Sequence, residues 1–599
     1  LKNSKLSFGK SNVSGDIKLY YSNINSSDIF SIDFINSAYI DLEIVDSKIS
    51  SFDLGKMLPN LKTNYDESWL VNTNIKGYLN DLFIENLLLE NKNNTINFKS
   101  NIKNIFHDNY SLTFDVINFD INSEEIDRLF PKFFGTVLPS SLKTFGRFKM
   151  DGYVDFKTDY VSSKFNLIIK QGLLKSDLKI FNFSNIDNAS YDGTISGYDL
   201  DLSSFVNMRN IKKSNFKFEI KGKGFTKEFL NSSVNGKIYD LDFNNYKLLN
   251  TDITGNIKDQ IFDGTMLVND DNLSLKFNGL IDFSEVLVDF DFDLNLINAD
   301  LNKLNFDIDS QISGLANVKL RGSEIENIIG DLSLNNVIFK SKGNSTLFED
   351  FNAQLRYNED IRIVNIRSVD AFSGILIGEY DFFNLKNTFL NSFGSDYKNY
   401  VSDSGTDFQN ISFNINFKPK FLSLFDQSIE IDENTFLSGS FNSNGDYELG
   451  LKSNSLKYDG LSIEEVDVKM DSDNGRLEIK NIKSNFLEGK ELVMESSFLN
   501  DTLFVKSNYT SFSNNINKLS FYHTINSENN SVFGFTDLDL ILNNMEWSLN
   551  KVSNNPSLTI NRNSNEFNIK NISFLNKDQS IDLNISNFKK QSKYDVSFK

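Results

Sequence analysis

The chain has 599 residues, a formal net charge of −20 and no cysteine. Nucleic acid and anionic membrane surfaces would repel this charge, so neither is an expected partner, and the lack of cysteine excludes disulfides and thiolate metal sites. Length alone predicts about four domains. However, only 5 prolines occur and no Pro/Gly/Ser-rich linker separates modules, so we expect one elongated sheet system.

The first part of the chain already shows the alternation of apolar and polar residues that is typical of strands. It begins with Leu1 rather than methionine, and neither a signal segment nor an apolar run long enough to span a membrane is found. We therefore interpret the chain as a fragment whose targeting segment or membrane anchor lies outside it.

Helices are predicted only at corners. Ser123 can cap a short helix that stops before Pro131, and another short helix is expected from Phe225 to Leu230. A later stretch is rich in Ser, Asp and Gly without sustained periodicity, so it is expected to be an exposed loop or insertion. The predicted segments are 1–121 (strands), 122–150 (helical corner), 151–390 (strands), 391–410 (polar loop) and 411–599 (strands).

Several predicted strands have one apolar face. Successive side chains of a strand point to opposite faces, and in the stretch 286–296 apolar residues alternate with Asp289, Asp291 and Asp293. The same alternation recurs in three other strands. The residues that we expect to line one apolar face are Phe165, Leu167, Ile169, Phe216, Phe218, Ile220, Val288, Phe290, Phe292, Leu294, Leu296, Ile411, Phe413, Ile415 and Phe417.

Turn dipeptides and an internal repeat punctuate these strands. Asn-Gly pairs favour two-residue hairpin turns, and a four-residue phrase with Asn in its third position recurs, where Asn predicts a bend in the strand. Chance recurrence in an Asn-rich chain is the alternative. The Asn-Gly pairs begin at Asn235, Asn278, Asn444 and Asn474, and the phrases are Ile363–Ile366, Ile479–Ile482, Ile569–Ile572 and Ile84–Leu87.

Residues suited to catalysis or metal binding do not cluster. The two histidines, His107 and His523, lie far apart without a ligand pattern, and no nucleophile elbow or phosphate loop is found. The alternating aspartates are better explained as a solvated face than as a calcium site, because neighbours on one strand face are too far apart for shared coordination. We expect no enzymatic activity, cofactor or metal, although paired carboxylates for glycoside hydrolysis are not excluded among 81 acidic residues.

The apolar face must then carry the function. One-sided strands ordinarily pack against another sheet or close a solid core. The chain has 56 phenylalanines against 21 tyrosines and 2 tryptophans, whereas a transmembrane barrel would need tyrosine and tryptophan at its interfaces. A packed core and an open apolar groove both remain possible at this point.

Part of the sequence resembles TamB proteins of Bacteroidota-type bacteria, most strongly from about residue 80 to 310. The phrases that carry the resemblance are Phe130–Phe134, Leu138–Lys143, Gly146–Phe148, Ile186–Gly193, Tyr198–Asp201, Lys223–Phe225, Phe277–Phe283 and Ala299–Leu304.

The resemblance implies an all-β fold in which an elongated, curled antiparallel sheet forms an open apolar groove. TamB belongs with the AsmA-like proteins, which share this repeating architecture with eukaryotic chorein-type lipid-transfer proteins. It implies a periplasmic protein, anchored in the inner membrane by a helix that this chain lacks, with an outer-membrane barrel of the TamA or BamA type as partner. Phospholipid acyl chains would be the cargo, bound by the apolar residues named above.

Two other functions remain open. The resemblance is also compatible with a scaffold that assembles outer-membrane proteins through exposed sheet edges. An extracellular β-solenoid that binds or cleaves polysaccharide would instead need a surface cluster of aromatic and acidic residues. The orientation of the phenylalanine face distinguishes these functions from lipid transport.

Overall fold

The computed structural model describes all residues except 22–31, 58–66, 124–145, 184, 186, 204–209, 227, 307, 324–326, 342, 359, 402–408, 425, 427, 485–487, 543–544, 553–554, 563, 565, 589–590 and 599. The described residues form mainly antiparallel strands, which confirms the all-β prediction. The chain divides into unit 1, Leu1–Val286 with Phe292–Gln311, and unit 2, Leu287–Asp291 with Ile312–Lys599.

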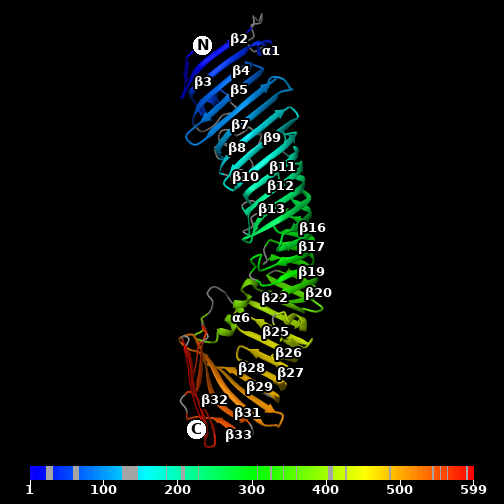
Figure 1. Ribbon diagram of the computed structural model, residues 1–599, viewed down its shortest axis with the longest axis vertical. Coiled ribbons are helices and arrows are strands. Elements are labelled where there is room, and N and C mark those ends of the chain that lie inside the picture. The colour runs from blue at the N-terminus through cyan, green and yellow to red at the C-terminus, as the bar shows by residue number, and fades with distance from the viewer. Residues whose placement is uncertain are drawn as a thin grey trace. The chain divides into compact units, whose positions relative to one another are not determined.

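In unit 1 each strand from β1 to β16 pairs antiparallel with the next strand along the chain, as Figure 1 shows. Hairpin after hairpin therefore extends the sheet without a crossover. The strands are β1 Ser4–Phe8, β2 Ser11–Tyr20, β3 Tyr39–Ser50, β4 Ser68–Tyr78, β5 Asp81–Glu90, β6 Thr95–Lys103, β7 Ser111–Asn122, β8 Arg147–Lys157, β9 Tyr160–Ile169, β10 Gly172–Phe181, β11 Ser190–Asp201, β12 Ile211–Lys223, β13 Asn231–Phe243, β14 Tyr246–Lys258, β15 Ile261–Asn269, β16 Leu273–Asp282 and β17 Val288–Asp300, which contributes to both units.

Unit 2 follows the same antiparallel rule from β19 to β37, with two places where a short strand shares a partner. β24 lies beside β26, and β33 and β34 both pair with β32 and β35. The strands are β18 Gln311–Gly322, β19 Ile329–Ser341, β20 Asn344–Asn358, β21 Ile361–Arg367, β22 Phe372–Glu379, β23 Asn410–Phe417, β24 Glu430–Ile431, β25 Thr435–Phe441, β26 Tyr447–Tyr458, β27 Leu461–Asp471, β28 Asn474–Lys483, β29 Glu488–Phe498, β30 Leu503–Ser511, β31 Ile516–Ile525, β32 Asn530–Leu542, β33 Met545–Leu549, β34 Ser557–Asn561, β35 Phe567–Asn576, β36 Gln579–Phe588 and β37 Gln591–Phe598.

The helices of the described residues are short. The predicted helical corner falls mostly on 124–145, outside the described residues, and the helix expected from Phe225 to Leu230 is wrong, because the described residues there form bends and turns. The helices are α1 Ile32–Ser37, α2 Ser51–Met57, the 3₁₀ turn η3 Phe382–Asn384, α6 Leu385–Gly394 and α7 Pro419–Leu422.

Two of the four Asn-Gly pairs do not form turns. Asn235 and Asn278 lie inside β13 and β16, so the turn prediction is wrong there. Asn444-Gly445 does form the turn between β25 and β26, and Asn474 begins β28 directly after a turn. Gly236 has a different role, because a Cβ there would lie 2.7 Å from the ring carbon Cδ1 of Phe218 on the neighbouring strand. This glycine makes room for an aromatic ring.

The bend predicted from asparagine is confirmed at two of the four repeated phrases. Asn481 and Asn571 have positive φ angles of 47° and 55°, and the pairing of β28 with β27 and of β35 with β36 shifts register at these places. The register also shifts beside Asn86, between Ile84 and Leu87. Asn365 pairs regularly with both neighbouring strands, so the prediction is wrong there.

These bulges keep the apolar residues on one face. Inward positions are two residues apart within a regular strand, but they are three apart across a bulge, as from Ile479 to Ile482, which pack in the same cluster. The extra residue would otherwise move every later side chain to the other face. Ile463, Val466 and Ile482 form a buried cluster at the bulges of β27 and β28. The bulges therefore preserve the apolar face and concentrate burial where the strands bend.

We predict that Asn481→Val destabilises the protein by about 1–2 kcal/mol, because a β-branched residue is strained at a positive φ. Asn481→Gly should stay close to the unsubstituted protein, since glycine adopts this conformation freely. The matched control is Asn365→Val in a regular strand, with an expected change within about 0.5 kcal/mol. Urea unfolding midpoints measure all three, and equal costs at both positions would contradict the assignment of the bulge.

Candidate functional site

The fifteen residues predicted to line an apolar face lie where the alternation places them. Each is buried or half-buried, whereas alternating neighbours such as Lys217, Glu219 and Asp291 are exposed. In β12, Phe218 lies opposite Ile195 of β11 and Gly236 of β13. Apolar side chains of one strand therefore meet apolar or small residues of the next strand.

Residues directly opposite one another form a continuous uncharged row across unit 1, which we call the unit 1 row. It crosses every strand from β3 to β16. Its members are Ile44, Thr73, Leu87, Phe98, Val116, Gly152, Phe165, Ser176, Ile195, Phe218, Gly236, Ile253, Met266 and Phe277.

The row one residue further along the same strands is polar. Lys164 Nζ lies 3.2 Å from Asp177 Oδ2, and Thr254 Oγ1 donates a hydrogen bond of 2.9 Å to Asn235 Oδ1. The opposite face of the sheet is thus solvated and satisfied by cross-strand pairs. The members of this polar row are Lys164, Asp177, Thr194, Glu219, Asn235, Thr254, Thr265 and Asn278.

Unit 2 has an uncharged row of its own, the unit 2 row, across β20 to β32 apart from the two-residue β24. Glycine again lies beside phenylalanine, since a Cβ at Gly439 would lie 2.6 Å from the ring carbon Cζ of Phe413. The members are Leu355, Val364, Leu376, Phe413, Gly439, Leu449, Met470, Gly475, Ser496, Val505, Phe521 and Phe535.

Burial along these rows is incomplete. The chain has 56 phenylalanines, yet among the described residues only Phe277, Phe348 and Phe441 have buried side chains. Residues in a core between two packed layers would be close-packed on all sides. Side chains that touch only lateral neighbours on one sheet remain half-exposed, which is the state observed here.

Residues 385–401, which we call the strap, cover one part of the unit 2 apolar face. The strap begins with α6, whose Phe389 ring lies 4.6 Å from the Phe441 ring and 6.2 Å from that of Phe413, a member of the unit 2 row. The ring of Phe393 lies 5.9 Å from Phe441. The strap therefore contacts the apolar row itself.

The strap corrects the prediction of an exposed loop at 391–410. Asn391 and Ser392 are buried at the end of α6, so that prediction is wrong for these positions, while 402–408 lie outside the described residues. Composition hid this contact, because the buried positions are small and polar. The spacing of Phe389, Phe393 and Tyr397 was the signal available in the sequence.

Beyond α6 the strap reaches β31. The Tyr397 hydroxyl lies 2.7 Å from Nδ1 of His523, and its ring lies 4.9 Å from Phe498. Burial raises the pKa of Tyr397 to about 12, while burial and the Arg562 guanidinium lower the pKa of His523. Both groups are therefore neutral near pH 7, and their contact is a neutral hydrogen bond rather than an ion pair.

Two more polar contacts hold the far end of the strap. The Lys398 backbone N–H donates to Asp501 Oδ1 over 2.7 Å, and Asn399 Nδ2 donates to the Ile525 carbonyl over 2.8 Å. Burial and the carboxylates of nearby turns raise the pKa of Asp396. Hydrogen bonds and the Tyr397 ring hold this end, whereas α6 is held by aromatic contacts.

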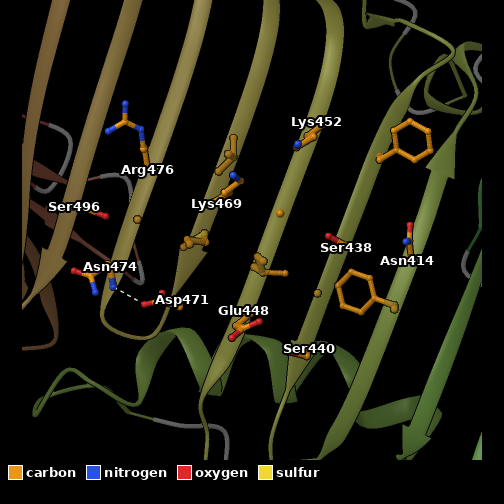
Figure 2. Close-up of a pocket in the computed structure, with 18 of the residues that line it drawn as sticks. Asn414, Ser438, Ser440, Glu448, Lys452, Lys469, Asp471, Asn474, Arg476 and Ser496 are labelled. Carbon is orange, nitrogen blue, oxygen red and sulfur yellow. Dashed lines mark hydrogen bonds between the residues drawn. The ribbon is translucent and has the colours of Figure 1, made fainter.

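A cavity of about 1120 Å³ lies in unit 2 and is lined by residues of β22 to β30 (Figure 2). Ser438 and Ser440 of β25 and Lys452 and Lys469 of the next two strands line it, together with Glu448. Cations and carboxylates are mixed in this lining, and Lys452 pairs with a carboxylate across the strand. The lining also includes Phe413, Leu449 and Met470 of the unit 2 row, so the cavity adjoins that row, and its mixed side chains do not select one class of ligand.

No metal-binding cluster of His, Asp or Glu occurs among the residues that the structure describes. Asp289 and Asp291 lie 3.8 and 3.9 Å from the side-chain nitrogens of Arg321 and Lys319, as expected of a solvated face. His107 is exposed.

Among the residues that the structure describes, no helix has the length and apolar character needed to cross a bilayer. Comparisons with protein-family models, curated proteins and solved structures found no match.

We predict that Phe218→Ala lowers the free energy of unfolding by about 1–2 kcal/mol. The same substitution in a closed core costs about 3–5 kcal/mol, but a half-buried ring has less buried apolar area to lose. Phe277→Ala, at a ring that is 6% exposed, should cost clearly more. Urea unfolding measures both variants. A cost at Phe218 as large as that at Phe277 would mean that a second layer covers the unit 1 row.

Proposed function

We propose that the chain is a non-enzymatic lipid conduit whose apolar face binds phospholipid acyl chains and guides them along the sheet. The observation that carries the proposal is the unit 1 row, which crosses fourteen consecutive strands without a charged residue and in which all members except Thr73, Ser176 and Phe277 are only half-buried. The unit 2 row supports the same function.

The hydrophobic effect gives the mechanism. Moving an acyl chain from a bilayer into water costs about 0.8 kcal/mol per methylene, so unassisted transfer of a two-chain lipid is prohibitively slow. Contact with half-exposed Phe, Ile, Leu and Met side chains removes much of this cost. Because such side chains impose no hydrogen-bond register, an acyl chain slides along the rows instead of docking at one position.

Polar groups are kept to the other face and to the strand ends. Ion pairs such as Lys164–Asp177 and Lys221–Asp192 lie on the polar face, where they favour solvation. Headgroups would accordingly remain at the wet edge while acyl chains contact the rows. This arrangement fits transport of lipid between the inner and outer membranes through the periplasm, with an outer-membrane barrel as partner.

The alternatives have less support. A polysaccharide-binding surface would present aromatic rings together with carboxylates, whereas the phenylalanines of the rows lie on the face opposite to Lys217 and Glu219. No observation in the described residues specifically favours a scaffold for outer-membrane proteins. Lipid transport is therefore the function that the geometry supports best.

We predict that Phe218→Arg lowers lipid transfer between liposomes about tenfold or more, because a charge within the row has to be desolvated by every passing acyl chain. Fluorescence dequenching with labelled phospholipid measures the transfer. The matched control is Glu219→Arg, which places the same side chain on the opposite face and should transfer lipid normally. A photo-crosslinking residue should capture lipid at position 218 and not at 219, and equal capture at both positions would contradict the proposal.

A further inference from the structure

The strap is not needed to connect its two strands. β22 and β23 are direct neighbours, and Glu379 pairs with Asn410, so a tight turn would suffice. Instead, the chain leaves β22, passes along the ends of strands that follow much later, and returns. It contacts Phe441 of β25 at one end and Ile525 of β31 at the other. The connection between these two paired strands does not by itself require so long a segment, so the strap is expected to have another role.

The strap also presents apolar surface of its own. Leu390 and Phe393 of α6 are 47% and 37% exposed, whereas Thr388 and Ser392 are each 1% exposed. A helix that docked to form a core would bury its large apolar residues and expose its small polar ones. In α6 the pattern is mixed: Phe389 and Phe393 pack against Phe441, but Leu390 stays exposed although the small polar Thr388 and Ser392 are buried.

The two ends of the strap are held in different ways. Aromatic rings hold α6 against Phe441 and Phe413. The far end is held by three hydrogen bonds, from Tyr397, Lys398 and Asn399, and by fewer ring contacts, mainly that of Tyr397 with Phe498. Val401, which follows them, is 69% exposed. Segments with few buried apolar contacts open at low free-energy cost. The far end can therefore detach while α6 stays in place.

We propose that the strap closes over acyl chains on the apolar face of unit 2, and that its far end, residues 397–401, must release from β31 and from the turn between β29 and β30 for a lipid to move past. The exposed Leu390 and the exposed part of Phe393 then contact the lipid. This inference rests on the proposed lipid-conduit function, since it assigns a gate to the same apolar face.

A reversible crosslink tests the gate. The chain has no cysteine, so Lys398→Cys with Asp501→Cys creates one thiol pair, at two residues joined by a 2.7 Å hydrogen bond. Oxidised protein should transfer phospholipid between liposomes about tenfold more slowly than the same protein after reduction. The control pair is Asn235→Cys with Thr254→Cys on the polar face of unit 1, where the crosslink should leave transfer unchanged.

A second variant tests the gate without a crosslink. Tyr397→Phe combined with Asn399→Ala removes two of the three hydrogen bonds at the far end and should raise the transfer rate about two- to fivefold, because opening becomes easier.

Lipid capture by a photo-crosslinking residue at position 218, in unit 1, distinguishes failure of the gate from failure of the lipid-conduit function. Capture there with equal rates in the oxidised and reduced pairs overturns the gate and leaves the conduit standing. No capture and no transfer by the unsubstituted protein overturn both.

Discussion

The structure depends on one constraint, which is that apolar side chains on one face of a sheet must find burial from lateral neighbours alone. Strand pairing satisfies the backbone, and cross-strand rows such as Ile195–Phe218–Gly236 give each ring its contacts. Glycine opposite phenylalanine follows from the same constraint, because two large side chains would collide there. The bulges serve the same constraint, because each one keeps the following apolar side chains on the face from which an extra residue would otherwise turn them away.

The two faces have opposite electrostatic character for the same reason. On the polar face, Lys164, Lys221 and Arg356 pair with aspartates across strands. Such exposed pairs contribute little to stability, but they keep the polar face solvated. On the apolar face of unit 2, the buried Arg362 instead lies 4.9 Å from the Tyr380 ring. The strap adds the one described segment that passes along strand ends from β25 to β31, and its far end adds hydrogen bonds to the kind of aromatic contact that holds α6.

Period-two alternation was enough to predict the all-β fold and the faces of β9, β12 and β23, because one strand carries that information by itself. Asn481 and Asn571 were also predictable, since asparagine tolerates positive φ. The Asn235-Gly236 pair led to a wrong turn prediction, because Gly236 lies opposite Phe218 of another strand and makes room for its ring. The spacing of Phe389, Phe393 and Tyr397 hinted at a helix in the strap, but where it docks could not be predicted, since burial of Thr388 and Ser392 depends on contacts with strands distant in sequence.

The central claim is that the apolar face is free to accept acyl chains, and native mass spectrometry tests it most directly. The chain is purified without detergent, incubated with phospholipid vesicles and then separated from them. If the account is correct, the spectrum shows several phospholipids bound per chain, because the rows cross many strands in both units. A spectrum containing only the lipid-free chain would contradict it.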